Sequence, residues 1–146
     1  MTRRDARRHA FALVFQMPFH EKATVEDLAK VKKWYYDDLA QVDRPKGKYA
    51  EYIDRAVWGV FDRQAQIDGV IENFLRDWDV TRISRVDLAI MRLAIYEMLC
   101  EADVPIGTAV NEAVEIAKEF GTDESAAFVN GVLGNVSRSM KDGANG

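Results

Sequence analysis

The amino-acid sequence predicts an all-α protein of about seven helices with short loops, packed as two helical sub-bundles that share a core. Apolar residues recur at three- and four-residue spacing over most of the 146 residues, which is the period of one helix face. No run alternates polar and apolar residues between turn residues, as half-buried strands do. The prolines Pro18, Pro45 and Pro105 fall where helical patterns stop or start.

The first two helices have clear start or stop signals. The first is expected over about residues 2–17 and ends before Pro18. The second begins at Thr24, whose hydroxyl can accept a free backbone N–H, and Asp27 three residues later completes a capping box.

From Lys48 to Trp78 the apolar residues fall on nearly the same helix face throughout. That is long for a single helix of a globular protein. We expect a break at Asp68-Gly69, which gives a long third helix and a short fourth.

The second half predicts three more helices. Ser84 and Asp87 form a second capping box, and the helix behind them is apolar on almost every side, as expected at the centre of a bundle. Pro105 lies near the first turn of the next helix, which Gly121 closes as a left-handed cap. The last helix is expected to fray after Met140.

Composition predicts a folded cytoplasmic protein. Hydrophobic residues make up 48% of the chain, so a sizeable core can form. No stretch approaches the roughly 18 apolar residues of a membrane span, and no secretory signal is present. The single Cys100 is interpreted as a small core residue in a reducing compartment. The alternative is a catalytic thiol, although His9 and His20 are far away in sequence.

The sequence does not favour an enzyme. It has no glycine-rich phosphate loop, no paired cysteines and no histidine pair at metal-ligand spacing, so we expect no catalytic residue, no metal and no cofactor. Glu112 and Glu115 are three residues apart and could pair as acid and base. An exposed helical face explains them more simply.

The charge distribution points to a polyanion. The net charge is −4, yet the first nine residues hold four arginines and one aspartate, a charge of +3 that leaves −7 for the rest. Arg3 and Arg7, like Arg4 and Arg8, are four residues apart and form a cationic strip on a helix. Positive charge near a helix N-terminus opposes the helix dipole, so a phosphate-rich partner would explain it, although a merely soluble helix start remains the alternative.

Two phenylalanines could stack on bases. Phe15 lies beyond the arginines with Phe11 four residues earlier, and aromatic rings beside a cationic strip suit single-stranded RNA. Phe11 is more simply a core residue. Phe128 is expected to be partly exposed near the first turn of the last helix, because the positions after it already form a complete apolar stripe. That stripe consists of Val129, Val132, Leu133 and Val136.

Several segments, in their joint order and spacing, resemble the NusB family of transcription antitermination factors. The similar segments are RRDARRHA and LVFQ within residues 3–16, IMRLAIYE at 90–97, VP at 104–105, AVNEAVEIAK at 109–118 and FVNGVL at 128–133. Residues 34–80 match only in helical pattern.

The resemblance implies a fold, partners and a function. The fold would be one domain over residues 1–146, built from two packed three-helix sub-bundles, roughly 1–80 and 81–140, with one extra helix. The protein would pair with NusE, a small-subunit ribosomal protein, and bind the single-stranded boxA element of leader RNA. In the RNA polymerase antitermination complex it would promote read-through, notably in ribosomal RNA operons.

The resemblance also assigns site residues. The RNA-contacting positions would be Arg3, Arg4, Arg7, Phe15 and Phe128, and the cationic strip adds Arg8. Asp87 is assigned to the surface that binds NusE. Many family members have tyrosine where Phe15 stands, so a hydroxyl contact to RNA would be lost here while stacking is kept.

Two other functions stay open. NusB-like domains also occur as RNA-binding appendages of RNA methyltransferases, although this length leaves no room for a methyltransferase domain. A purely structural helical protein is the third hypothesis. RNA binding separates it from the first two, and NusE binding separates the first from the others. Whether the free protein is a monomer or a homodimer stays open.

Overall fold

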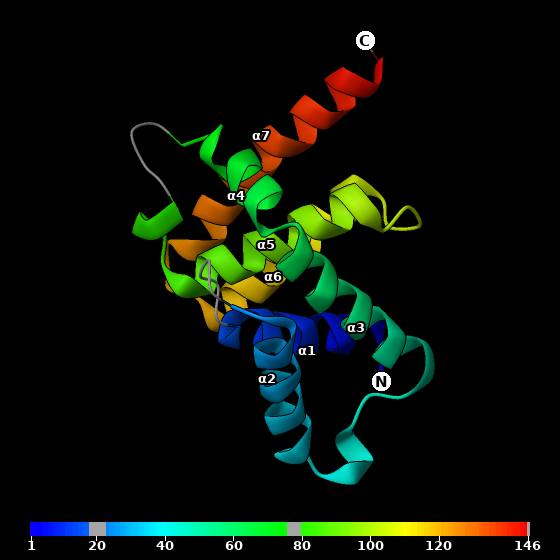
Figure 1. Ribbon diagram of the computed structural model, residues 1–146. Helices are drawn as coiled ribbons and strands as arrows, with labels where there is room; N and C mark the ends of the chain where they lie inside the picture. The colour runs from blue at the N-terminus through cyan, green and yellow to red at the C-terminus, as the bar shows by residue number, and fades with distance from the viewer. Residues whose placement is uncertain (18–22, 76–79, 146) are drawn as a thin grey trace.

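A computed structural model describes residues 1–17, 23–75 and 80–145. Within these ranges the chain forms seven α-helices, two short 3-10 helices and no strand, which confirms the all-α prediction. The helices are α1 (Arg3–Gln16), α2 (Val25–Asp37), α3 (Gly47–Asp62), α4 (Gln64–Glu72), α5 (Arg85–Cys100), α6 (Ile106–Phe120) and α7 (Ser125–Asn145), with 3-10 turns η1 (Gln41–Asp43) and η2 (Val80–Arg82) (Figure 1).

The helix starts follow the predicted capping chemistry. Thr24 and Asp27 form the complete capping box of α2. Ser84 accepts the backbone N–H of Asp87 at 3.1 Å, which caps α5. The Asp87 carboxylate does not return a bond to Ser84, so the predicted second box is only half formed.

The break in the long apolar stretch lies earlier than predicted. Helix α3 ends at Asp62 and α4 begins at Gln64, with the backbone of Arg63 leaving the helical region between them. Asp68 lies inside α4, where its two carboxylate oxygens accept bonds of 2.8 Å from Arg92 of α5. This ion pair fixes α4 against α5, so Asp68 serves packing and does not interrupt the helix. Trp78 lies outside the described residues.

Two predictions about helix ends were wrong. Gly121 follows α6 with φ of −93°, in extended backbone and not in the left-handed region. A side chain there would collide with Ser125, whose hydroxyl accepts the N–H of Thr122 at 2.9 Å. Glycine is therefore required by the close approach of α7. Helix α7 also continues past Met140 to Asn145 instead of fraying.

Helix α5 is the centre of the molecule. Every residue from Asp87 to Glu97 is buried, as the apolar sequence predicted. The helices α1, α3, α4, α6 and α7 all pack against α5. Because α1 and α6 both contact this one helix, residues at the start of the chain come to lie beside residues more than 100 positions later.

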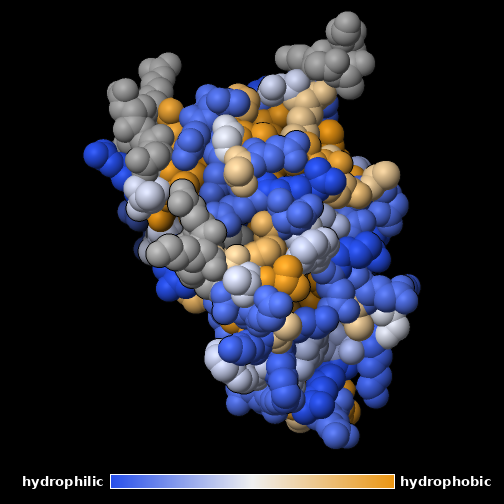
Figure 2. Space-filling model, in the orientation of Figure 1, coloured by the Kyte–Doolittle hydropathy of each residue, from blue (hydrophilic) through white to orange (hydrophobic). Residues whose placement is uncertain are grey.

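The remaining packing groups the other helices around this centre. Helix α1 packs on α2 and α3, whereas α4 contacts α5 and α7. Helix α2 projects away from the body of the molecule (Figure 1), and hydrophilic residues cover much of the lower part of the same face (Figure 2). The division into sub-bundles near residue 80 stays a prediction. None of the described helices has the length and hydropathy needed to cross a bilayer.

Candidate nucleic-acid interface

The four arginines of α1 do not share one environment. The side chains of Arg3, Arg4 and Arg8 reach solvent, whereas Arg7 is only 6% exposed. Ala6 and Ala10 are fully buried on the same helix. Arg7 therefore lies on the inner side of α1 and not on the exposed strip.

Arg7 belongs to a buried polar cluster that joins α1, α3 and α5. Its Nε donates to Glu97 Oε1 at 2.9 Å, and the hydroxyl of Tyr52 donates to the same carboxylate. Glu97 is 2% exposed. Burial raises the pKa of the Glu97 carboxyl, against the lowering effect of Arg7. Burial and the neighbouring Glu97 charge also raise the pKa of Tyr52.

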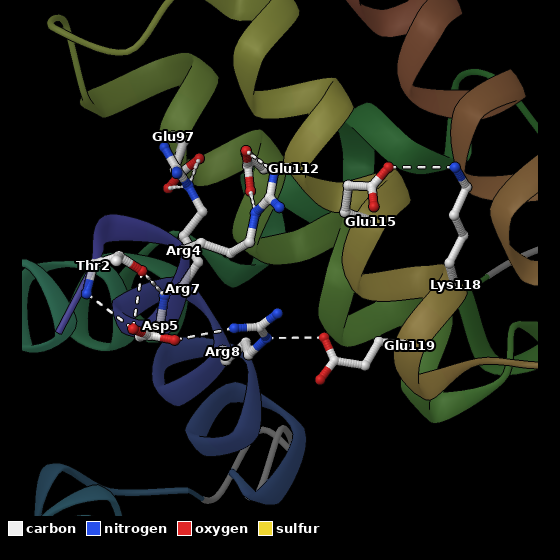
Figure 3. Close-up of polar contacts among 10 residues, drawn as sticks. All are labelled: Thr2, Arg4, Asp5, Arg7, Arg8, Glu97, Glu112, Glu115, Lys118 and Glu119. Carbon is white, nitrogen blue, oxygen red and sulfur yellow. Dashed lines mark hydrogen bonds and ion pairs between the residues drawn. The ribbon is translucent and has the colours of Figure 1, made fainter. Parts of the chain in front are cut away.

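Two of the exposed arginines, Arg4 and Arg8, are paired with carboxylates of α6 (Figure 3). Arg4 makes two bonds of 2.9 Å to Glu112 of α6. Arg8 donates to Glu119, also of α6, at 2.8 Å. The bond from Arg4 lowers the pKa of Glu112, although partial burial opposes this effect. The cationic strip therefore faces an acidic side of α6, which neutralises much of its charge.

The remaining pairs complete this picture. Arg3 lies 3.0 Å from Asp103, in the turn between α5 and α6, and both side chains are exposed. Glu115, the suggested partner of Glu112 in an acid–base pair, instead contacts Lys118 at 3.3 Å. The two carboxylates thus have separate cationic partners and form no catalytic dyad.

The histidine and cysteine side chains form no nucleophilic site among the described residues. His9 Nδ1 lies 2.6 Å from the hydroxyl of Tyr35. Cys100 is partly buried and packs against the core at the end of α5. His20 lies outside the described residues. No cluster of three metal-ligating side chains occurs in the described ranges.

The aromatic side of the candidate interface lies at the end of α1. The Phe15 ring is half-buried, and the guanidinium of Arg85 lies 5.0 Å from its centroid. Arg85 also donates to the Phe15 carbonyl at 3.1 Å. Phe11 is buried, as expected of a core residue. Sequence reasoning missed Arg85, although a cation at the first position of a helix is the same unfavourable placement that marked the α1 strip.

Two further predicted residues lie on α5 and α7. Phe128 is half-buried in the first turn of α7 and packs against the core, which confirms its predicted partial exposure. Asp87 is 9% exposed, and its Oδ1 has no hydrogen-bond partner in the described part of the chain. A buried carboxylate oxygen without a donor is costly, and only the small exposed part of the Asp87 side chain can contact another molecule.

Comparison with known sequences gives a consistent result. The model of the NusB family matches residues 4–138. The chain is 45% identical over 136 residues to the transcription antitermination protein NusB of Acetivibrio thermocellus, covering 93% of this chain and 88% of that protein. It is 40% identical over 133 residues to the corresponding protein of Agathobacter rectalis, with 91% and 97% covered.

Solved structures agree. The structure of T. maritima NusB superposes with a TM-score of 0.81 at 33% identity, covering 94% of this chain and 92% of that one. A crystal structure of the antitermination factors NusB and NusE in complex with dsRNA gives 0.75 at 21% identity, with 94% and 96% covered. Because the identity to the NusB of this complex is only 21%, that similarity establishes the fold alone.

Proposed function

The chain belongs to the NusB family, and from this we propose that it is a transcription antitermination factor. It binds boxA-type leader RNA together with NusE and helps RNA polymerase to read through terminators, notably in ribosomal RNA operons. The observation that carries this proposal is the 45% identity to an antitermination protein over 93% of the chain. The relatives carry this name and not that of a methyltransferase, which favours it over the appended-domain alternative.

The proposed RNA surface runs along the exposed side of α1. Arg3, Arg4 and Arg8 supply guanidinium groups that can grip phosphates. The pairs of Arg3 and Arg8 do not prevent this, because both partners are exposed and such ion pairs contribute little and are screened by salt. Arg4 makes two bonds to Glu112, which is only 16% exposed, so a phosphate replaces the carboxylate more easily at Arg3 and Arg8 than at Arg4. Phe15 and Phe128 supply rings on which bases can stack.

We assign Arg7 a structural role in place of the RNA contact first predicted. Its guanidinium is buried and held by Glu97. Moving it to the surface would leave a buried carboxylate without its cation, which is strongly unfavourable. We also propose that the protein is cytoplasmic and performs no catalysis.

Binding measurements test the function directly. We would titrate boxA RNA into the protein with and without NusE by fluorescence anisotropy. Tighter binding in the presence of NusE is the expected result, since the two proteins would present one joint surface. If the RNA does not bind under either condition, the proposal is wrong.

Asp87→Asn should weaken NusE binding while leaving the fold intact. We propose that the exposed part of the Asp87 carboxyl accepts a hydrogen bond from NusE. Hydrogen bonds to charged groups contribute about 1.5–3 kcal/mol, so a loss of this size is expected by isothermal titration calorimetry. Glu26→Gln, an exposed change on α2, is the control. Equal NusE affinity for both variants would remove Asp87 from the interface.

Phe128→Ala should weaken RNA binding by about 1–3 kcal/mol, the effect of losing one stacked base. Because the ring is only half-buried, stability should fall by less than the roughly 3–5 kcal/mol of an emptied core phenylalanine site. Trp58→Ala, which removes another partly exposed ring on α3, controls for general effects. Unfolding of the Phe128 variant would make this residue part of the core.

A further inference from the structure

A cavity of about 290 Å³ lies between the start of α1 and the first turns of α3. These two segments lie side by side (Figure 1). Arg3 of the proposed RNA surface is one of the lining residues, so the cavity is continuous with that surface. Its volume is near the lower end of small-ligand pockets, a size suited to one nucleotide.

The cavity wall carries more positive than negative side chains. Arg3, Arg7, Lys48 and Arg55 line it together with Glu51 and Asp103. Of the four cations, Arg7 is held by Glu97, and Arg3 is paired with Asp103. The other two, Lys48 and Arg55, come from α3 and differ in how firmly they are held by carboxylates.

Lys48 and Arg55 are the available cations. Lys48 is exposed and makes no ion pair with any described residue, and its Nζ lies 5.2 Å from the centroid of the Tyr49 ring. The guanidinium of Arg55 is half exposed and contacts Glu101 at 3.3 Å, a long ion pair. Lys48 can take a phosphate oxygen without breaking an ion pair. Glu101 is buried, and Arg55 contacts it through Nε and one terminal nitrogen, so Arg55 would bind a phosphate through its other terminal nitrogen and keep this pair.

Two tyrosines give the cavity an aromatic wall. The hydroxyl of Tyr52 is used inside the protein, where it bonds Glu97. Tyr49 is half-buried, and its hydroxyl makes no hydrogen bond to a described residue. A tyrosine ring beside an unpaired lysine offers stacking for a base and a charge for the adjoining phosphate.

We propose that this cavity binds one nucleotide of the RNA strand that lies on the α1 arginines. The base stacks on Tyr49, and its phosphate contacts Lys48 and Arg55. This inference rests on the proposed RNA-binding function. The ligand is a nucleotide within the strand and not a free mononucleotide, because neighbouring phosphates on α1 bring it to the cavity.

Two variants measure the two contacts. We would titrate boxA RNA in the presence of NusE at several salt concentrations. Tyr49→Leu should weaken binding by about 5- to 150-fold, as expected for one lost stacked base, whereas Tyr49→Phe should bind like the wild type. Lys48→Ala should reduce the slope of log affinity against log salt by about 0.7, the value for one phosphate on a single strand.

The controls carry the same changes on α2. Trp34→Leu removes a ring that is 66% exposed, and Lys30→Ala removes an exposed cation. Neither residue lines the cavity. Both should leave RNA binding unchanged. Photocrosslinking of 4-thiouridine-containing RNA should modify peptides containing Tyr49, and millimolar uridine monophosphate should not prevent this.

The outcomes separate the two proposals. If the wild type binds no RNA, the proposed function fails. If it binds RNA but Tyr49→Leu and Lys48→Ala bind equally well with an unchanged salt slope, the cavity inference is wrong and the function stands. Blocking of the crosslink by uridine monophosphate would also overturn the inference, since the site would then take free nucleotide. Lys48 is exposed, so its variant remains a test even if Tyr49→Leu does not fold.

Discussion

Replacing Arg7 by alanine should lower the free energy of unfolding by about 3–5 kcal/mol, the usual cost of removing one partner from a buried ion pair. The change leaves the carboxylate of Glu97 buried with only the hydroxyl of Tyr52 as a donor among the contacts of this cluster. Urea denaturation, monitored by the circular dichroism signal of the helices, measures this loss of unfolding free energy.

The pH dependence of this loss has a defined sign. Burial already raises the pKa of Glu97, and Arg7 opposes that rise, so its removal raises this pKa further. A carboxyl with a raised pKa in the folded state stabilises the fold at low pH and loses that effect as pH rises through the folded pKa. The loss of unfolding free energy in Arg7→Ala, relative to the wild type, should therefore be largest at neutral pH and become smaller as the pH is lowered.

Two comparisons isolate the buried pair. Arg4→Ala removes an exposed arginine from the same helix and should change stability little, because water screens its ion pair. The double change Arg7→Met and Glu97→Met should recover part of the loss, since both buried charges are removed together. If Arg7→Ala is as stable as Arg4→Ala, the cluster does not hold α1 in place.

The buried arginine also shows where sequence reasoning reaches its limit. Helical spacing placed Arg3 with Arg7 and Arg4 with Arg8 on one cationic strip, but it could not tell that Arg7 points inward. That depends on Glu97, which lies 90 positions later on α5. The local sign was that Arg7 directly follows the buried Ala6 and lies three residues before the buried Ala10.

Local chemistry was predicted better than contacts between helices. The Thr24 cap of α2 and the burial of α5 follow from residues adjacent in sequence, and both are confirmed. The place of Asp68 inside α4 and the extended Gly121 instead involve contacts between helices, of Asp68 with Arg92 and of Gly121 with Ser125. The acidic side of α6 facing the arginines was missed for the same reason.

Of the variants proposed for RNA binding, the one with Arg3, Arg4 and Arg8 all replaced by alanine should show the largest loss of affinity. If each arginine contacts one phosphate, each adds about −0.7 to the slope of log affinity against log salt. The triple variant should flatten that slope by about two. The ratio of wild-type to variant RNA affinity should therefore fall about 100-fold when the salt concentration rises tenfold. Anisotropy titrations across a salt series, with NusE present, give this slope.

The acidic residues of α6 provide the opposite test. Glu112→Gln and Glu119→Gln keep the arginines but remove the carboxylates that compete with phosphate. Both variants should bind RNA more tightly than the wild type. An unchanged slope in the triple arginine variant would exclude the α1 strip as the RNA site. Weaker RNA binding by the glutamine variants would mean that the ion pairs hold the arginines in position for RNA. Exchange of carboxylate for phosphate therefore requires that the arginine variant lowers RNA affinity and that the glutamine variants raise it.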